Sequence, residues 1–124
     1  MPVTYTIERE ARLVSLTASG PTSVEDLLDV YARLREDPYF EPGFDQLFDF
    51  RDATPTNIYS KQVDMLLDSN PFSLTSRRAY VQAPGVGFGM GRVAEAFAEG
   101  KNLRLRSFLD MAEARRWVLA AERD

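Results

Sequence analysis

The segment Gln46-Leu47-Phe48-Asp49-Phe50 has the composition of a β-strand, and a turn-rich stretch precedes it. A helical pattern lies on each side of it. Before the strand, a helix is expected to begin at Ser23. After the strand, the threonines and Pro55 indicate a loop over residues 52–57, and the spacing then predicts a helix over residues 58–68. The inward positions of these two helices are Val24, Leu27, Leu28, Tyr31 and Leu34 in the first, and Val63, Leu66 and Leu67 in the second.

Towards the N-terminus, the chain predicts a β-hairpin and a capped helix. Residues 3–7 alternate apolar and polar side chains, residues 13–18 form a second short strand, and a brief polar link joins them. Ser23 and Asp26 fit a capping box, in which each side chain accepts from a free backbone N–H group. Asp37-Pro38 ends that helix, because the residue before a proline disfavours helical geometry.

Towards the C-terminus, strands and helices continue to alternate. We expect a strand over residues 78–83, a glycine-rich turn over 84–91, a third helix ending at Gly100, and a strand from Leu103 to Phe108. A last helix follows, capped by Asp110 and Glu113. The apolar positions are Val93, Ala94 and Phe97 in the third helix, and Met111, Ala114, Trp117, Val118 and Ala121 in the last.

The order of elements is therefore ββαβαβαβα. Strands that alternate with helices pair in parallel through right-handed crossovers, and the initial hairpin adds an antiparallel pair. The sequence predicts an α/β fold with a mixed five-stranded sheet and four helices, in a single domain over residues 1–124.

Composition excludes several kinds of site. The 124 residues include no cysteine and no histidine, so thiolate sites, a histidine-based triad and a usual zinc site cannot be built. A net charge of −4 argues against nucleic acid as a partner. No apolar run is long enough to span a membrane, and the start of the chain does not read as a secretory signal. We expect a cytoplasmic protein without metal or cofactor.

Five stretches, taken in order, resemble the SpoIIAA-like group of bacterial proteins, described as STAS-like or CRAL-TRIO-like. The resemblance implies the fold of anti-sigma-factor antagonists, with no defined activity. The stretches are residues 37–45, 47–51 (Leu-Phe-Asp-Phe-Arg), 77–81 (Arg-Arg-Ala-Tyr-Val), 88–92 (Phe-Gly-Met-Gly-Arg) and 108–117.

Asp49, Arg51 and Asp52 form the first candidate site. They follow a central strand at the end where α/β folds place ligand crevices. Alternation puts Asp49 and Arg51 on one face of the strand, where they could orient a ligand or a partner. The favoured alternative is a structural ion pair.

Thr54 and Thr56 are candidate phosphorylation sites, because the resemblance to anti-sigma-factor antagonists implies a regulatory serine near the start of the next helix. The chain departs from that family's Asp-Ser-Ser-Gly type of turn, since Asp52-Ala53-Thr54-Pro55-Thr56 stands there. Helix capping by Thr56 or Asn57 is the favoured alternative.

The glycine-rich segment before the third helix supplies the other candidates, Phe88, Gly89 and Arg92. Glycines let a backbone present N–H groups to an anion, and an arginine can grip it. We expect Arg92 in the first turn of the helix, tied to Asp49 or Asp52 if it is structural. A tight turn with Phe88 in the core is the favoured alternative.

Three functions remain open. The first is a non-enzymatic regulatory module that binds a protein partner, as the STAS-like resemblance implies. The second is a carrier of a small apolar or anionic ligand, favoured by the CRAL-TRIO likeness and by the loop aromatics, which could instead cover the core. The third is an enzyme that uses Asp49 with Asp52.

A homodimer through the sheet edge and the aromatic loop is a separate expectation. The loop aromatics are Tyr39, Phe40, Phe44 and Phe72.

Overall fold

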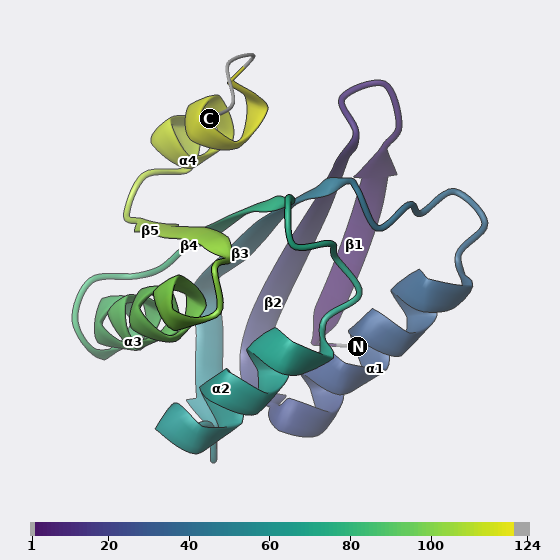
Figure 1. Cartoon of the computed structure of the whole chain (residues 1–124). Coiled ribbons are helices and arrows are strands. Elements are labelled where there is room, and N and C mark those ends of the chain that lie inside the picture. Colours follow the sequence, from purple (N-terminus) through teal and green to yellow (C-terminus); the bar gives the residue numbers. More distant parts are fainter. Residues whose placement is uncertain (1, 121–124) are drawn as a thin grey trace.

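The computed structural model describes residues 2–120, in which five strands form one sheet with helices on both faces (Figure 1). The strands lie in the sheet in chain order, with β1 and β2 antiparallel and all other neighbours parallel. This arrangement confirms the predicted fold and the order ββαβαβαβα. The elements are β1 (Val3–Glu8), β2 (Leu13–Ser23), α1 (Val24–Glu36), β3 (Asp45–Thr56), α2 (Ser60–Ser69), β4 (Arg77–Val81), α3 (Val86–Gly100), β5 (Arg104–Phe108) and α4 (Met111–Leu119).

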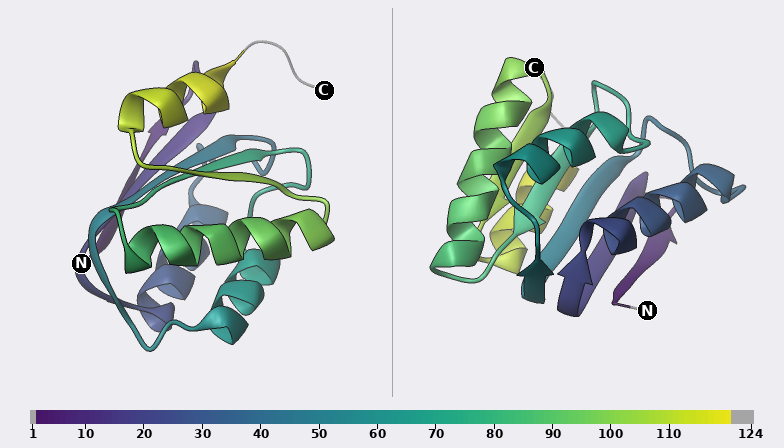
Figure 2. Two further views of the ribbon diagram at one scale, coloured as in Figure 1. Left: turned by 90° about the vertical axis from the view of Figure 1, so that its left-hand side faces the viewer. Right: turned by 90° about the horizontal axis from the view of Figure 1, so that it is seen from below.

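Three helices cover one face of the sheet, and α4 lies on the other (Figure 2, left). The parallel connections all advance in the same direction, and right-handed crossovers then place α1, α2 and α3 on a common face. We call this the three-helix face and the opposite one the α4 face. Within residues 2–120, no helix is both long and apolar enough to cross a membrane.

A separate apolar core lies on each face. The core of the three-helix face is the larger, and it includes Leu16, Val30, Leu34 and Phe48, each at most 1% exposed. The core under α4 is made by Leu13, Leu47, Ala79, Val81, Phe108, Ala114 and Val118, with Met111 and Trp117 packed against it. The predicted inward position Ala121 lies outside the described residues.

The start of α1 confirms the predicted capping box. The Asp26 backbone N–H donates to Ser23 Oγ at 3.2 Å, and the Ser23 N–H donates to Asp26 Oδ2 at 2.9 Å. Asp37 ends the helix in extended geometry, as the following proline requires.

Strands β2 and β3 are both longer than predicted, and the expected loop over residues 52–57 is wrong. The two strands pair as far as Ser23 and Thr56, whereas the pairing of β3 with β4 ends at Asp49 and Val81. They therefore leave the sheet as a two-stranded ribbon. The threonines and Pro55 in residues 52–57 indicated a loop, but a strand in a two-stranded ribbon has a free edge, where proline is tolerated.

The glycine-rich turn expected over residues 84–91 is also wrong, since α3 begins at Val86 and Gly87, Gly89 and Gly91 lie within the helix. Gly85 supplies the turn with φ of 90°, a conformation that favours glycine. Gly91 serves close packing: a Cβ there would lie 2.5 Å from Ser107 Oγ of β5. The absence of a side chain at Gly91 thus allows α3 to lie this close to β5.

The amino ends of β3 and β4 are densely filled on the three-helix face. Phe40 meets Phe44 and Phe72 edge-on, with ring centroids 6.3 and 5.2 Å apart. Arg78 is 1% exposed and donates to Asn70 Oδ1 and to the backbone oxygens of Phe72, Ser73 and Ser76. The loop aromatics therefore cover the core, except for Tyr39, which is exposed beneath the Arg9 guanidinium.

Candidate functional site

The carboxyl ends of β3 and β4 border a cavity of about 580 Å³ on the three-helix face. Ligand pockets in proteins span about 300–1,000 Å³, so the space can hold a small molecule. We call it the apolar cavity, because most side chains around it are apolar. Ligand crevices in open α/β sheets lie at this end of the strands.

The β2–β3 ribbon forms one wall of the apolar cavity. The pairing of β2 with β3 shifts register between Thr17 and Ser19, where β3 contains one more residue than β2. As a result, Phe50 and Ala53 both pack towards the three-helix face, although they are three positions apart. Phe50 also stacks on Phe48 at 4.0 Å between ring centroids, which anchors this wall to the core.

Helices α2 and α3 form the opposite walls and the rim. Val63 and Leu66 of α2 and Met90 and Ala94 of α3 line the space. At the rim, two apolar side chains are unusually exposed: Tyr59 (65%), just before α2, and Val86 (83%), at the first residue of α3.

A small polar group interrupts the apolar lining. Gln46 Nε2 donates to Tyr31 Oη at 3.3 Å, and the Tyr80 hydroxyl lies close enough to Tyr31 for each to influence the pKa of the other. Burial raises the pKa of Tyr31 and raises that of Tyr80 well above 10.0, so both are neutral phenols at neutral pH. Gln82, which is 8% exposed, also lines the cavity and carries an amide group. A ligand could hydrogen-bond there.

Asp49, Arg51 and Asp52 do not line the apolar cavity. Asp49 alternates with Phe48 and so points to the α4 face. Arg51 donates hydrogen bonds to both carboxylate oxygens of Asp49, with Nε–Oδ1 at 3.0 Å and Nη2–Oδ2 at 2.9 Å. Partial burial opposes ionisation of Asp49, but the hydrogen bonds from Arg51 outweigh it and lower the pKa of the carboxyl. The pair has the geometry of a self-contained ion pair, and Asp52 is exposed beside it.

Thr54 and Thr56 both lie in the ribbon and are exposed, but only Thr54 borders the apolar cavity. Neither they nor Asn57 caps α2, so that expectation is wrong. The cap is Tyr59, whose backbone N–H donates to Gln62 Oε1 at 3.1 Å. The ribbon extends the strand past both threonines, which removes them from the helix start.

The expected position of Arg92 is wrong as well. Because α3 begins at Val86, Arg92 lies in its second turn, and its Nε pairs with Glu95 Oε1 at 3.1 Å rather than with Asp49 or Asp52. Its side chain is 69% exposed, so it has no need of a buried carboxylate. Phe88 is half-buried in α3 but belongs to neither core, and Gly89 is exposed.

Sequence reasoning missed the residues that shape the apolar cavity, above all Tyr31, Phe50, Tyr80 and Gln82. Tyr31 and Tyr80 occupy core positions of a helix and a strand, and such positions usually take purely apolar side chains. The hydroxyl groups of these two tyrosines at core positions were therefore the signal in the sequence that could have indicated a polar group inside the core. Within the described part of the chain, no three acidic side chains gather in a way that could hold a metal ion.

Comparison with known proteins supports the fold. No protein-family model and no curated protein matches the sequence. Among solved structures, the chain is similar to an uncharacterised protein of the DUF3478 family from Shewanella loihica PV-4, which has a SpoIIAA-like fold. The TM-score is 0.64 and the identity 20%, over 94% of this chain and 93% of that one. The chain therefore has the SpoIIAA-like fold that the sequence resemblance implied.

Proposed function

We propose that this protein binds a small, mostly apolar molecule in the apolar cavity and acts through that binding rather than through catalysis. The observation that carries the proposal is the cavity itself, about 580 Å³ of space at the carboxyl ends of parallel strands. The apolar side chains that line this open space are in contact with water, which is unfavourable. A ligand would remove that apolar surface from water.

The arrangement of polar groups supports a ligand with one hydrogen-bonding end. Tyr31, Tyr80 and Gln82 supply the hydrogen-bonding groups among the buried lining residues, together with Thr22, whose hydroxyl donates to Gly20 O at 3.0 Å. The rest of the ligand would lie against Phe50, Val63 and other apolar side chains. A neutral or singly charged amphiphile fits this pattern better than a sugar or a nucleotide, which carry many polar groups.

The absence of catalysis is part of the proposal. The chain has no histidine or cysteine, and the candidate carboxylates Asp49 and Asp52 lie outside the cavity. Arg51 already engages both oxygens of Asp49. These features favour a role in carrying or sensing a ligand.

Titration with decanol and decanoate, followed by amide NMR, tests the proposal. We expect saturable binding of at least one of them, with the largest shifts at residues of the cavity wall such as Ala53 and Met90. Ala53→Phe and, independently, Met90→Trp should fill the space and weaken binding about tenfold, which corresponds to about 1.4 kcal/mol. Ala112→Phe on the exposed side of α4 is the matched control. Absence of binding, or an affinity of the filled variants equal to that of the original protein, would overturn the proposal that the apolar cavity binds a ligand.

A further inference from the structure

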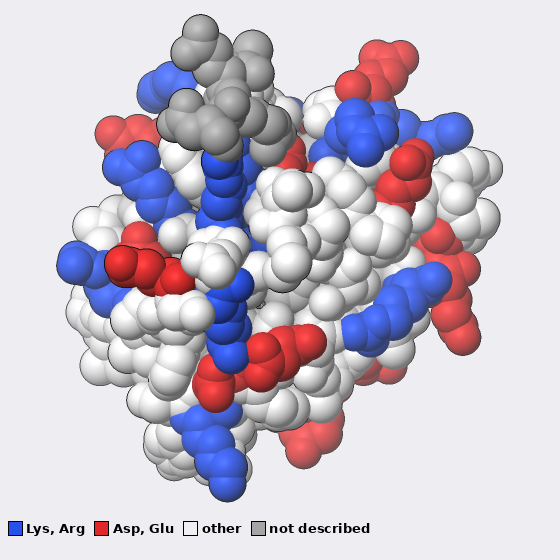
Figure 3. All heavy atoms as spheres, in the orientation of Figure 1, with Lys and Arg blue, Asp and Glu red and all other residues white. Residues whose placement is uncertain are grey.

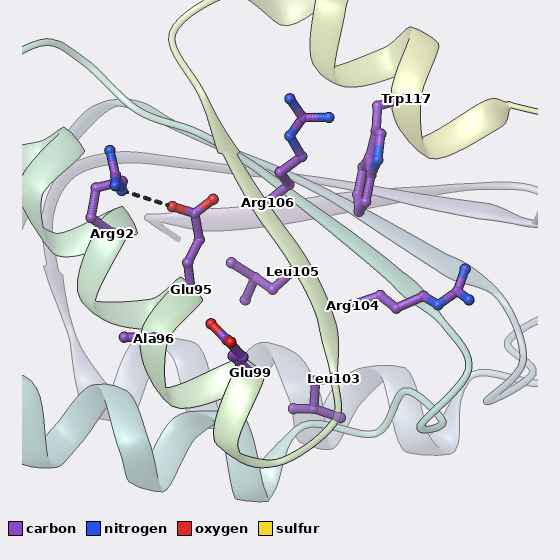
Figure 4. Close-up of a pocket in the computed structure, with 9 residues that line it drawn as sticks. All are labelled: Arg92, Glu95, Ala96, Glu99, Leu103, Arg104, Leu105, Arg106 and Trp117. Carbon is purple, nitrogen blue, oxygen red and sulfur yellow. Dashed lines mark ion pairs between the residues drawn. The ribbon is translucent and has the colours of Figure 1, made fainter. Parts of the chain in front are cut away.

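A second concave site lies along the free edge of β5, between α3 and α4. This edge groove has a volume of about 560 Å³. Figure 4 shows β5 running along it, with Glu95 and Glu99 of α3 on one side and Arg104, Arg106 and Trp117 on the other. The groove shares no residue with the apolar cavity, so it raises a separate question about what binds there.

The floor of the edge groove is strand backbone whose outward hydrogen-bonding edge is open in part. β5 is the last strand of the sheet, and successive residues point their N–H and C=O groups to alternate sides. The Leu103 N–H donates to Ala98 O at 2.9 Å, and the Ser107 N–H donates to Glu95 Oε2 at 3.1 Å. Leu105 lies between them on the same side, and its N–H has no partner within residues 2–120. An added strand could pair there.

Charge in the edge groove is divided between its two sides, although Arg92 of α3 also lines the groove and pairs with Glu95 on the acidic side. Within the described part of the chain, neither Arg104 nor Arg106 forms an ion pair, although Arg106 lies over the Phe108 ring at 5.3 Å. Acidic and basic side chains are interspersed over the side of the molecule seen in Figure 3, so complementarity to a partner has to be local. The two arginines, two positions apart, provide such a local pattern.

We propose that the edge groove binds an extended segment of a partner protein, which pairs with β5 as a sixth strand and carries acidic side chains at alternate positions. Alternate side chains of a strand point to opposite faces. One set would therefore meet Arg104, Arg106 and the Trp117 ring, while the other would meet Glu95 and Glu99 and be uncharged or basic. Strand addition at a free edge is a general mode of peptide recognition.

A second copy of this chain is a poor occupant. Antiparallel pairing of two β5 strands about a two-fold axis would bring Arg104 of one copy opposite Arg106 of the other on the same face. Like charges directly opposite each other destabilise a strand pair. The arginines therefore favour an acidic partner over a homodimer through this edge.

The test uses a labelled hexapeptide of alternating threonine and glutamate, acetylated and amidated, with fluorescence anisotropy and amide NMR on the whole chain. The control peptide has the same composition in two blocks, three glutamates then three threonines. We expect the alternating peptide to bind more tightly and to shift the amide signals of Leu105 and Ser107. Binding should weaken with added salt, because the groove is exposed.

Variants of the protein complete the test. Arg104→Glu with Arg106→Glu should weaken binding about tenfold or more, whereas Arg9→Glu with Arg116→Glu, which changes net charge equally, should not. Glu95→Ala frees the Ser107 N–H and should strengthen binding. Ala53→Phe should leave it unchanged, so failure here is distinguishable from failure of the ligand proposal. Absence of binding at millimolar peptide, equal binding of the block peptide, or shifts confined to the apolar cavity would each overturn the inference.

Discussion

The two ends of the three-helix face are built from the same helices and strands, yet one end is filled and the other is hollow. At the amino ends of β3 and β4, a cluster of phenylalanines and the buried Arg78 occupy the space. At the carboxyl ends lies the apolar cavity. Packing of helices on a sheet therefore does not create the hollow. It arises where the β2–β3 ribbon leaves the sheet and where α2 and α3 begin.

The filled end should depend most on Arg78. Replacing it in Arg78→Met would leave several buried or half-buried oxygens unpaired, and each such loss costs about 1–3 kcal/mol. We expect the free energy of unfolding to fall by about 3–5 kcal/mol in denaturant titration. Arg116→Met, at an exposed position, is the control and should change little. A loss below about 1 kcal/mol for Arg78→Met would show that this arginine does not hold the 70–76 loop.

Truncating an apolar side chain should cost more at the filled end than at the hollow one. Phe72 is 6% exposed within the phenylalanine cluster, and Phe72→Ala should cost about 3 kcal/mol. Met90 already faces empty space, so Met90→Ala creates little new cavity and should cost about 1 kcal/mol. Equal losses in thermal or chemical unfolding would contradict the difference between the ends.

Enlarging a side chain should show the opposite asymmetry. Ala98 of α3 is 1% exposed and lies away from the apolar cavity, so Ala98→Phe should overpack the core and cost about 2–3 kcal/mol. Ala53 borders the apolar cavity, so the larger side chain in Ala53→Phe can enter open space. We expect this substitution to change the free energy of unfolding by less than about 1 kcal/mol. If Ala53→Phe unfolds the protein as readily as Ala98→Phe, the cavity is not available space.

The smallest effect is expected on the α4 face, away from both ends. Glu8 joins the hairpin to α4, and its hydrogen bond from Arg115 Nη2 at 2.7 Å lowers the pKa of the carboxyl below 4.5. A lowered carboxyl pKa adds stability above the unfolded value, and that stability is lost as pH falls through the folded value. Both side chains are partly exposed, so the contribution is less than about 1 kcal/mol.

Unfolding of Glu8→Gln and the original protein at several pH values measures this contribution. The stability difference should be constant above pH 4.5 and shrink below it. Decanol binding should not follow this titration, since Glu8 is remote from the apolar cavity. A difference that grows on acidification would contradict the assigned pairing.

The fold was predictable because its signals are local. Periodicity located all nine elements, and the Ser23 cap and the Asp37-Pro38 stop fixed the limits of α1. The ribbon and the start of α3 were not predictable from local signals. Pro55 is compatible with a strand only because β4 ends early, and Gly91 is compatible with a helix because β5 lies so close.

The candidate site was less predictable than the fold. The sequence predicted a site at the charged residues Asp49, Arg51 and Arg92, because binding and catalysis usually need charged groups. In the structure these residues form ion pairs with near neighbours in the chain. The apolar cavity depends on Phe50 and Ala53 sharing a side, which requires a register shift between two strands. No pattern within one strand reveals such a shift.

The most direct test of the central claim is native mass spectrometry of the protein purified from its source cells, beside Ala53→Phe prepared in the same way. The apolar cavity predicts that the original protein carries one small molecule per chain and that the filled variant is bare. The same adduct on both proteins, or none on the original, would contradict the claim that the carboxyl end of the sheet is a ligand site.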